Sequence, residues 1–319
     1  MEDDPAPRTV FLRDTSRSVI ARNDSPDIPF ELSLNPYRGC EHGCIYCYAR
    51  PTHEYLGFSA GLDFETRIMV KADAPLLLRE ALSGASWKPA PVAIGGVTDP
   101  YQPVERRLRL TRRCLEVFWE FRNPVSLVTK NHLITRDIDL LGEMARLNLA
   151  AVHVSITTLD AELARIMEPR TASPRLRLET IQKLAKAGVP VCALVAPVIP
   201  GLTDHEMPAI VAAAASAGAT SAGYQPLRLP LCVADLFTQW LERHLPDRKE
   251  KVLNRIRSMR EGKLNNAEFG LRMTGRGVFA EQIGRMFEVA ARKAGLNRRG
   301  IRLATEHFRR PGKQMELFE

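Results

Sequence analysis

The sequence predicts an α/β fold: a partial (β/α)6 TIM-like barrel with a basic, helical region appended at its C-terminus. Six strand-like runs, rich in apolar and β-branched residues, alternate with helical stretches. The runs are apolar almost throughout, which is typical of a parallel sheet covered on both faces. With 319 residues, 45% of them hydrophobic, the chain is long enough to bury one large core, alone or with a smaller appendage.

The predicted elements follow one another along the chain, and Asp or Pro opens several of the helices while Gly or Asn closes them. We expect an N-terminal extension at 1–30, a core domain at 31–246, and a basic helical region with a terminal tail at 247–319. In a barrel of this kind, chemistry gathers where the strands end. The strands are predicted at 30–37, 91–98, 124–130, 150–158, 190–200 and 219–227, and the helices at 74–83, 105–122, 137–148, 175–187 and 204–217.

Three cysteines lie close together in the stretch RGCEHGCIYCYAR, as Cys40, Cys44 and Cys47. This crowding differs from the evenly distributed pairs of a secreted disulfide framework, so reduced thiols and a metal site are expected. One alternative is a zinc site completed by His42 or His53. The other is an iron-sulfur cluster, in which three thiolates leave one iron open to a small ligand.

The spacing Cys-x3-Cys-x-aromatic-Cys, with Tyr46 as the aromatic residue, resembles the signature of the radical S-adenosylmethionine (SAM) superfamily. Other segments resemble the branch of that superfamily that contains spore photoproduct lyase, and with the cysteines they cover residues 35–230. These segments are GGVTDPYQPVE at 95–105, LVTKN at 127–131, RDIDLL at 136–141, HVSITTLD at 153–160 and RIMEPRTASPRLRLETIQKLAKAG at 165–188.

The resemblance implies an enzyme whose 4Fe-4S cluster is bound by the three cysteines and whose free iron binds the methionine end of SAM. It also implies a flavodoxin- or ferredoxin-like electron donor. Without the resemblance, Gly95 to Asp99 would be an ordinary strand-to-helix turn. Lys130 would be a surface lysine, and Ser155 would be a buried hydroxyl bonded to the backbone. With it, Gly95 and Gly96 meet the methionyl amine, Thr98 and Asp99 supply polar groups, Lys130 balances the carboxylate, Ser155 reaches the ribose, and Tyr46 lies beside the adenine.

The remaining cysteines are expected in the core, because Cys114 is in phase with apolar helix residues and Cys192 lies in an apolar strand. Cys232, near a predicted strand end, is a candidate radical partner for which burial is the simpler interpretation. Spore photoproduct lyase has a hydrogen-donating cysteine near the strand end that corresponds to GGVTD. This sequence has none there, so repair of the spore thymine lesion is not expected.

The charge of the chain favours an anionic partner. Its net charge is +8, and residues 285–313 hold nine Lys or Arg against only Glu288 and Glu306. This pattern is typical of nucleic-acid binding, and equally of a solvated helix face. We therefore expect action on nucleic acid, as in DNA repair or modification. The alternatives are radical modification of a peptide or small molecule, and a zinc-stabilised nucleic-acid-binding protein without catalysis.

The final residues GKQMELFE place Gln314, Leu317 and Phe318 in an arrangement that resembles the peptide by which bacterial repair enzymes dock on the sliding clamp. A peptide of residues 309–319 is expected to bind purified clamp, and loss of the Leu-Phe pair should remove that binding. The polar N-terminus lacks the pattern of a signal peptide, and no apolar run is long enough for a membrane helix. A cytoplasmic protein without membrane contact is expected.

Overall fold

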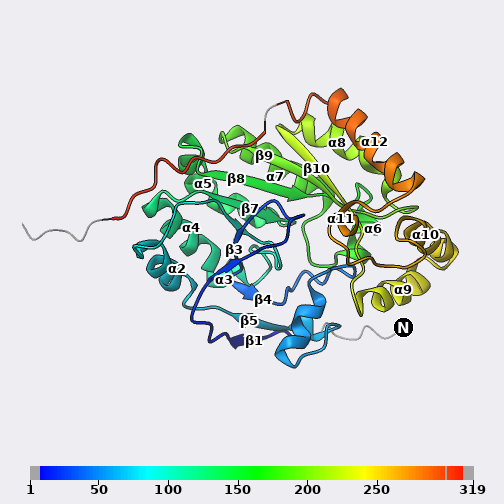
Figure 1. Ribbon diagram of the computed structural model, residues 1–319, viewed down its shortest axis with the longest axis horizontal. Coiled ribbons are helices and arrows are strands. Elements are labelled where there is room, and N and C mark those ends of the chain that lie inside the picture. The colour runs from blue at the N-terminus through cyan, green and yellow to red at the C-terminus, as the bar shows by residue number, and fades with distance from the viewer. Residues whose placement is uncertain (1–7, 299, 312–319) are drawn as a thin grey trace, which may run out of the picture.

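The computed structural model describes residues 8–298 and 300–311, and its main feature is a seven-stranded sheet in the order β10-β9-β8-β7-β6-β3-β2 (Figure 1). Six strands are parallel, and β2 pairs antiparallel with β3 at the edge. The strands are β2 (Ile20–Arg22), β3 (Leu32–Leu34), β6 (Val92–Ile94), β7 (Val125–Thr129), β8 (Ala150–Ser155), β9 (Val191–Val198) and β10 (Ser221–Pro226).

Each of the six predicted strands contains one of the six parallel strands, which confirms the parallel α/β sheet. Side chains of β3 and β6 are buried at every position, so these strands have no polar face to alternate with. Leu34, Ile94 and Val152 meet helix residues such as Cys114 in one large core. This core fixes the carboxyl ends of the strands relative to one another.

The predicted helices also form, with one interruption. The stretch predicted at 105–122 splits at Arg109, whose φ of 52° is left-handed, because the buried Glu105 carboxylate accepts hydrogen bonds from the Thr111 and Arg112 amides and begins a new helix there. The helices of this part are α2 (Ala74–Ser83), α3 (Glu105–Leu108), α4 (Leu110–Phe121), α5 (Ile138–Arg146), α6 (Ala161–Met167), α7 (Pro174–Lys186) and α8 (Met207–Ser216), with 3-10 turns η2 (His132–Asp137) and η3 (Asp204–Glu206).

A second, three-stranded sheet was not predicted from the sequence. It has the order β1-β5-β4, formed by β1 (Val10–Arg13), β4 (Tyr37–Arg38) and β5 (Arg67–Val70). The cysteine segment leaves β4 and returns to β5 through η1 (Arg50–Leu56) and α1 (Asp63–Thr66). The cysteines are therefore held in a loop anchored at both ends by this small sheet, and the N-terminal extension contributes a strand to each sheet.

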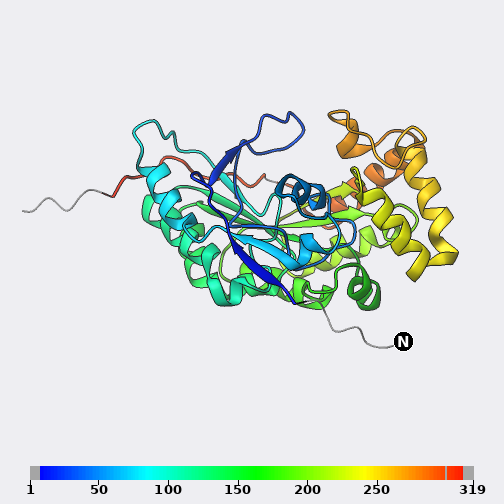
Figure 2. The same cartoon turned by 90° about the horizontal axis from the view of Figure 1, so that it is seen from below.

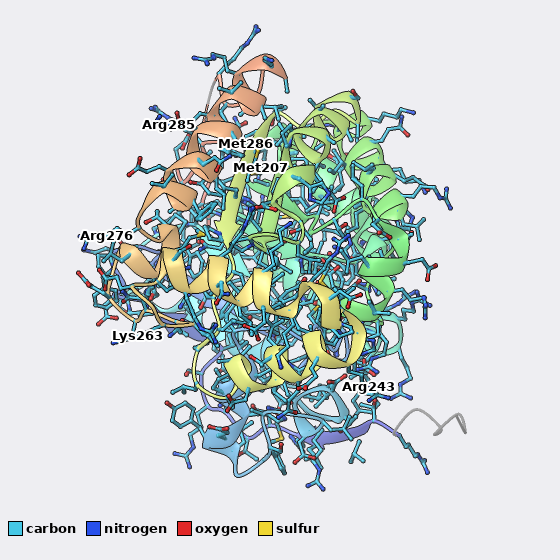
Figure 3. The ribbon with its side chains drawn as sticks, turned by 90° about the vertical axis from the view of Figure 1, so that its right-hand side faces the viewer. Met207, Arg243, Lys263, Arg276, Arg285 and Met286 are labelled. Atoms are coloured by element: carbon cyan, nitrogen blue, oxygen red, sulfur yellow. The ribbon has the colours of Figure 1, made fainter. Side chains whose placement is uncertain are left out.

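The C-terminal part adds four helices, of which α12 belongs to the main core. The Tyr224 ring of β10 lies 4.8 Å from the Phe287 ring of α12, and Ile283 is buried in the same cluster. Figure 3 shows Met286 of α12 on the side that faces α8 and Met207. This helix therefore covers the last parallel strand. The four helices are α9 (Val233–His244), α10 (Pro246–Met259), α11 (Leu271–Thr274) and α12 (Val278–Lys293).

The segment 300–311 runs along the amino ends of the strands. The Ala304 amide donates to the carbonyl of Asn148, just before β8, and Arg309 and Arg310 donate to carbonyls at the C-terminal ends of α4 and α2. Figure 2 shows this red segment leaving at the opposite end of the molecule from α9 and α10. Two arginines of the predicted basic tail thus satisfy helix-end carbonyls far from the cysteines.

The proposed clamp-binding residues Gln314, Leu317 and Phe318 lie outside the described residues, so their binding to the clamp stays a prediction. No helix within 8–298 or 300–311 is long and apolar enough to cross a membrane.

Candidate functional site

The three cysteines lie on one loop at the carboxyl end of the parallel sheet. Cys40 and Cys44 are buried, and Cys47 is half-buried. A glycine precedes each of the first two, and both glycines have left-handed φ angles, +79° at Gly39 and +66° at Gly43. A Cβ on Gly39 would lie 2.8 Å from the Phe64 carbonyl oxygen, so the loop approaches its neighbours too closely for any side chain there.

Arg50 holds this loop from inside. The side chain is 2% exposed and follows the last cysteine by three residues. Its guanidinium donates to the carbonyl oxygens of Cys44 at 3.1 Å and Gly43 at 3.1 Å, to two carbonyls of the 60–61 turn, and to Glu65 at 2.9 Å. All five donors of a guanidinium lie in one rigid plane, so these bonds fix the path of the backbone between the cysteines.

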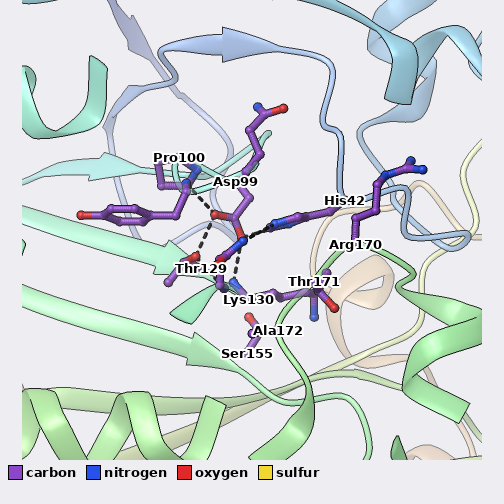
Figure 4. A network of polar contacts seen from close by, with 12 residues as sticks. His42, Asp99, Pro100, Thr129, Lys130, Ser155, Arg170, Thr171 and Ala172 are labelled. Carbon is purple, nitrogen blue, oxygen red and sulfur yellow. Dashed lines mark hydrogen bonds and ion pairs between the residues drawn. The ribbon is translucent and has the colours of Figure 1, made fainter. Parts of the chain in front are cut away.

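A second network ties the loop to the ends of β6 and β7 (Figure 4). The Asp99 carboxylate accepts from the Thr129 hydroxyl at 2.7 Å and from the Lys130 amide at 2.7 Å. His42, between the first two cysteines, has Nδ1 3.4 Å from Asp99 Oδ2 and Nε2 3.0 Å from Asn131 Nδ2. Both ring nitrogens of His42 are therefore engaged with the strand ends.

The segment after α6 closes the loop from the other side. The carbonyl of Met167 accepts from the amide of Ile45 at 3.0 Å, and Arg170 contacts both the Glu41 carbonyl and Glu65. Residues of the RIMEPR segment therefore hold the cysteine loop in place.

Glu168, in the same segment, is the centre of a buried ionic network. It is 2% exposed and contacts the Tyr46 hydroxyl, the Arg177 guanidinium, the Thr157 hydroxyl at 2.7 Å and the Lys130 ammonium at 3.2 Å. Two cations and one carboxylate are thus buried together beside the cysteine loop. A buried carboxylate of this kind is stable only because its partners neutralise it.

Gln102 and Glu41 join the loop to the segment after β6. The Gln102 side chain accepts from the Glu41 amide at 2.9 Å and donates to the Gly39 carbonyl at 3.2 Å. In return, the Glu41 carboxylate accepts from the Val104 amide at 2.6 Å. The YQPV portion of GGVTDPYQPVE is therefore hydrogen-bonded directly to the cysteine loop.

The thiols lie in a buried environment that disfavours their charged form. Burial is the first cause that raises the pKa of all three thiols, because a thiolate is poorly solvated there. The positive charge of Lys130 opposes this effect at Cys44 and Cys47. Iron bound at the loop would supply further positive charge and hold the sulfurs as thiolates.

A mononuclear zinc site completed by His42 or His53 is not preformed in this structure. Such a site needs donor atoms that converge on one ion at about 2.3 Å for sulfur. Among the described residues, no three His, Cys, Asp or Glu side chains are gathered in this way, and this includes the three loop cysteines. His42 is bonded to strand-end residues, and His53 Nε2 lies 2.9 Å from the Arg67 carbonyl oxygen. Neither histidine completes a zinc site with the cysteines here.

The predicted residues after β6 are brought to the cysteine loop. Gly95 has a φ of +93°, and a Cβ there would lie 2.4 Å from the Val128 carbonyl oxygen, so packing against β7 requires the glycine. The carbonyl of Gly96 accepts from the Tyr48 hydroxyl. Thr98 is buried and donates to the Tyr37 carbonyl at 2.9 Å. Their predicted contacts with SAM stay predictions.

Tyr46, Lys130 and Ser155 lie at the same edge of the sheet. The Lys130 ammonium lies 5.7 Å from the Tyr46 ring centre and donates to the Ala196 carbonyl at 2.8 Å. Burial, followed by the charge of Arg177, lowers the pKa of Lys130 to about 7. Ser155 ends β8 and is 5% exposed. The structure thus gathers all the sequence-predicted residues up to residue 155, while their individual ligand contacts stay predictions.

Residues 34–214 match the family model described as the Radical SAM superfamily. This chain belongs to the radical SAM superfamily. Its members are enzymes that use a 4Fe-4S cluster and SAM.

Proteins of similar sequence come from distant organisms. An uncharacterized protein of Mycobacterium tuberculosis strain H37Rv is 39% identical over 222 residues, which are 69% of this chain and 65% of that protein. An uncharacterized protein of Methanocaldococcus jannaschii is 28% identical over 174 residues, 54% of this chain and 62% of that protein. The chain therefore spans slightly less than two thirds of the relatives it matches.

Solved structures with a similar fold include spore photoproduct lyase. A variant with bound AdoMet and dinucleoside spore photoproduct superposes with a TM-score of 0.64 at 16% identity, over 90% of this chain and 80% of that one. A second variant gives 0.64 at 17% identity over the same shares. At these identities the likeness concerns the fold alone.

The residues of this radical SAM chain fit the cofactors of the superfamily. Cys40, Cys44 and Cys47 would hold the cluster on a loop whose path is already fixed, with the Lys130 charge nearby. When bound, the cluster supplies the electron for cleavage of SAM to methionine and a 5′-deoxyadenosyl radical. Buried polar partners keep the surrounding strand ends rigid, which is what a preorganised site requires.

Sequence reasoning missed the residues that position the loop: Glu41, His42, Arg50, Gln102, Glu168, Arg170 and Arg177. Arg50 carried no distinctive signal, since the polar and charged residues Thr52, His53 and Glu54 follow it closely. Glu168 and Arg170 lie inside the RIMEPR segment, and the sequence suggests His42 only as a zinc ligand.

Arg50→Lys is expected to weaken cluster retention because one ammonium cannot reach carbonyls on both sides of the loop as the planar guanidinium does. We expect faster iron loss to a chelator under anaerobic conditions and an altered electron paramagnetic resonance signal of the reduced cluster. Arg67→Lys, on the exposed ion pair with Asp63, is the matched control. Equal iron-loss rates in wild type and Arg50→Lys would contradict the positioning role.

Proposed function

We propose that this chain binds a 4Fe-4S cluster through Cys40, Cys44 and Cys47, cleaves SAM reductively, and uses the radical on nucleic acid in DNA repair or modification. A flavodoxin- or ferredoxin-like protein would donate the electron. The observation that carries the proposal is the cysteine loop itself, fixed at the carboxyl end of a six-stranded parallel sheet. Reactive groups of parallel barrels are held at this end.

Nucleic acid is the substrate class that the charge supports. The chain has a net charge of +8. Figure 3 shows Arg243, Lys263, Arg276 and Arg285 spread over the side of α9, α10 and α12, and all four are exposed. The fold neighbour spore photoproduct lyase has been solved with a dinucleoside lesion. Because residues 95–99 contain no cysteine, we do not extend the proposal to the spore lesion itself.

Anaerobically purified protein tests the proposal in two steps. Loaded protein should contain about four irons per chain, and dithionite with SAM should yield methionine and 5′-deoxyadenosine. Deuterated DNA, RNA and peptide substrates are then compared for transfer of deuterium into 5′-deoxyadenosine. Colourless protein with stoichiometric zinc would contradict the enzyme proposal. Deuterium transfer from the peptide alone would contradict the nucleic-acid part.

A further inference from the structure

Arg228 lies beside the cysteine loop on the last parallel strand. It follows β10 by two residues, at the carboxyl end, and Figure 1 shows α11 next to this end of the strand. Its guanidinium carbon lies 5.6 Å from the ring centre of Tyr48, which directly follows Cys47. The Tyr48 hydroxyl donates to the Gly96 carbonyl, so this ring is held across the end of β6. Arg228 thus lies next to the residue that follows the third cysteine of the loop.

The charge of Arg228 has no carboxylate partner among residues 8–298 and 300–311. Its Nη1 lies 3.3 Å from the sulfur of Met273, a weak acceptor. Its Nε is buried without a hydrogen-bond partner in the described chain. Leaving a partly buried guanidinium unpaired is costly, and an anionic ligand would remove that cost.

The nearby carboxylate of Asp27 is already paired with another arginine. The Asp27 carboxylate is taken by Arg272, with Oδ2 2.8 Å from Nε and Oδ1 2.5 Å from Nη2, and it also accepts from the Gly270 amide at 3.0 Å. Arg260 donates to the carbonyls of Leu227 and Leu271. Arg228 therefore stands among two other arginines and keeps donors available for an incoming anion.

Exposed aromatic rings accompany these arginines. Tyr48 is 48% exposed, and Phe269 is 58% exposed with the Arg272 guanidinium 4.6 Å from its ring centre. Proteins bind single-stranded nucleic acid with cationic groups that contact the phosphates and aromatic rings that stack on the bases. A simple carboxylate ligand could pair with an arginine but could not stack on the exposed rings.

We propose that Arg228 binds a backbone phosphodiester of a single-stranded or extruded nucleotide, with a neighbouring base against Tyr48. This inference rests on the proposed action on nucleic acid and names the group that would seat the strand. The phosphate oxygens would accept hydrogen bonds from the Arg228 guanidinium, which pairs with no carboxylate in the described chain.

The test measures binding of a fluorescent thymidine decamer to cluster-loaded protein at several salt concentrations. Arg228→Gln should weaken binding about tenfold and reduce the magnitude of the salt slope by about 0.7, the value for one phosphate contact on a single strand. Arg228→Lys should bind with intermediate affinity, because it keeps the charge and loses the fork. Arg146→Gln, an equal loss of charge on exposed α5, should bind like wild type. Iron content verifies that each variant is folded.

Three outcomes would overturn the subsite. Wild type and Arg228→Gln could bind the decamer equally, Arg146→Gln could lose as much affinity, or a decamer with neutral methylphosphonate linkages could show the same tenfold difference. In these cases binding by wild type still supports action on nucleic acid. If wild type binds no decamer, both the subsite and the nucleic-acid proposal fail, while SAM cleavage, measured separately, still reports on the enzyme.

Discussion

Changing Cys40, Cys44 or Cys47 singly to alanine will remove most of the iron and abolish reductive SAM cleavage. Each thiolate would bind a separate iron, and Cys114 and Cys192 cannot replace a lost ligand because they belong to the core and the sheet. Iron content, the visible absorption of the cluster, and 5′-deoxyadenosine from dithionite-reduced protein measure the effect. We expect at least a hundredfold loss of product.

Cys192→Ala is the matched control for this experiment. Cys192 is 7% exposed, and its thiol pKa is raised by burial like those of the three loop cysteines. It lies on β9, away from the loop, so its substitution should keep iron and cleavage and cost stability at most. If all four variants lose iron equally, the loss reflects instability and not ligation. If a loop variant retains full iron, that cysteine is not a ligand.

Glu168→Gln will cause the second large effect, on stability and on the site together. Glu168 is the carboxylate between Arg177 and Lys130, and neutralising it leaves two buried cations to repel each other. Breaking a buried ionic network by removing one partner costs about 3–5 kcal/mol. Thermal unfolding of the anaerobic, cluster-loaded protein should show a large decrease in Tm, with weaker binding of SAM beside it.

Glu162→Gln is the control on the same helix segment. Glu162 pairs with Arg165 on the surface of α6, and its side chain is 79% exposed. Such a pair contributes about 0–1 kcal/mol, so Tm should change little. A Tm for Glu168→Gln that matches this control would show that the network does not stabilise the fold.

Local patterns explain why the sequence predicted so much of the fold. Helix α2 was predicted with its exact bounds, because Pro and Gly mark its ends and apolar residues recur on one face. The apolar runs predicted β6 to β10 because a strand buried on both faces needs no alternation. The prediction of one helix over 105–122 was wrong, since the buried Glu105 caps a new helix after Arg109.

The small sheet and the N-terminal strands were missed for a different reason. Strands β1 and β4 have four and two residues, too short for a period to be visible, and they form because β5 pairs with both. Similarly, α12 begins 52 residues after β10 ends, and only its packing against Tyr224 and α8 shows that it covers the sheet. Pairing partners decide such elements, and no local window contains both partners.

The sequence by itself determined the parallel α/β class and the cysteine motif, because the strand pattern and the spacing of the thiols are encoded within short stretches of chain. Only the tertiary structure decided what surrounds the thiols. Glu168 reaches Tyr46 across 122 positions, and Arg170 reaches Glu65 across 105. Arg228 lies over Tyr48 although 180 positions separate them. Such contacts depend on the order and register of the parallel sheet, which bring the carboxyl ends of its strands to one edge, and residue spacing does not contain that information.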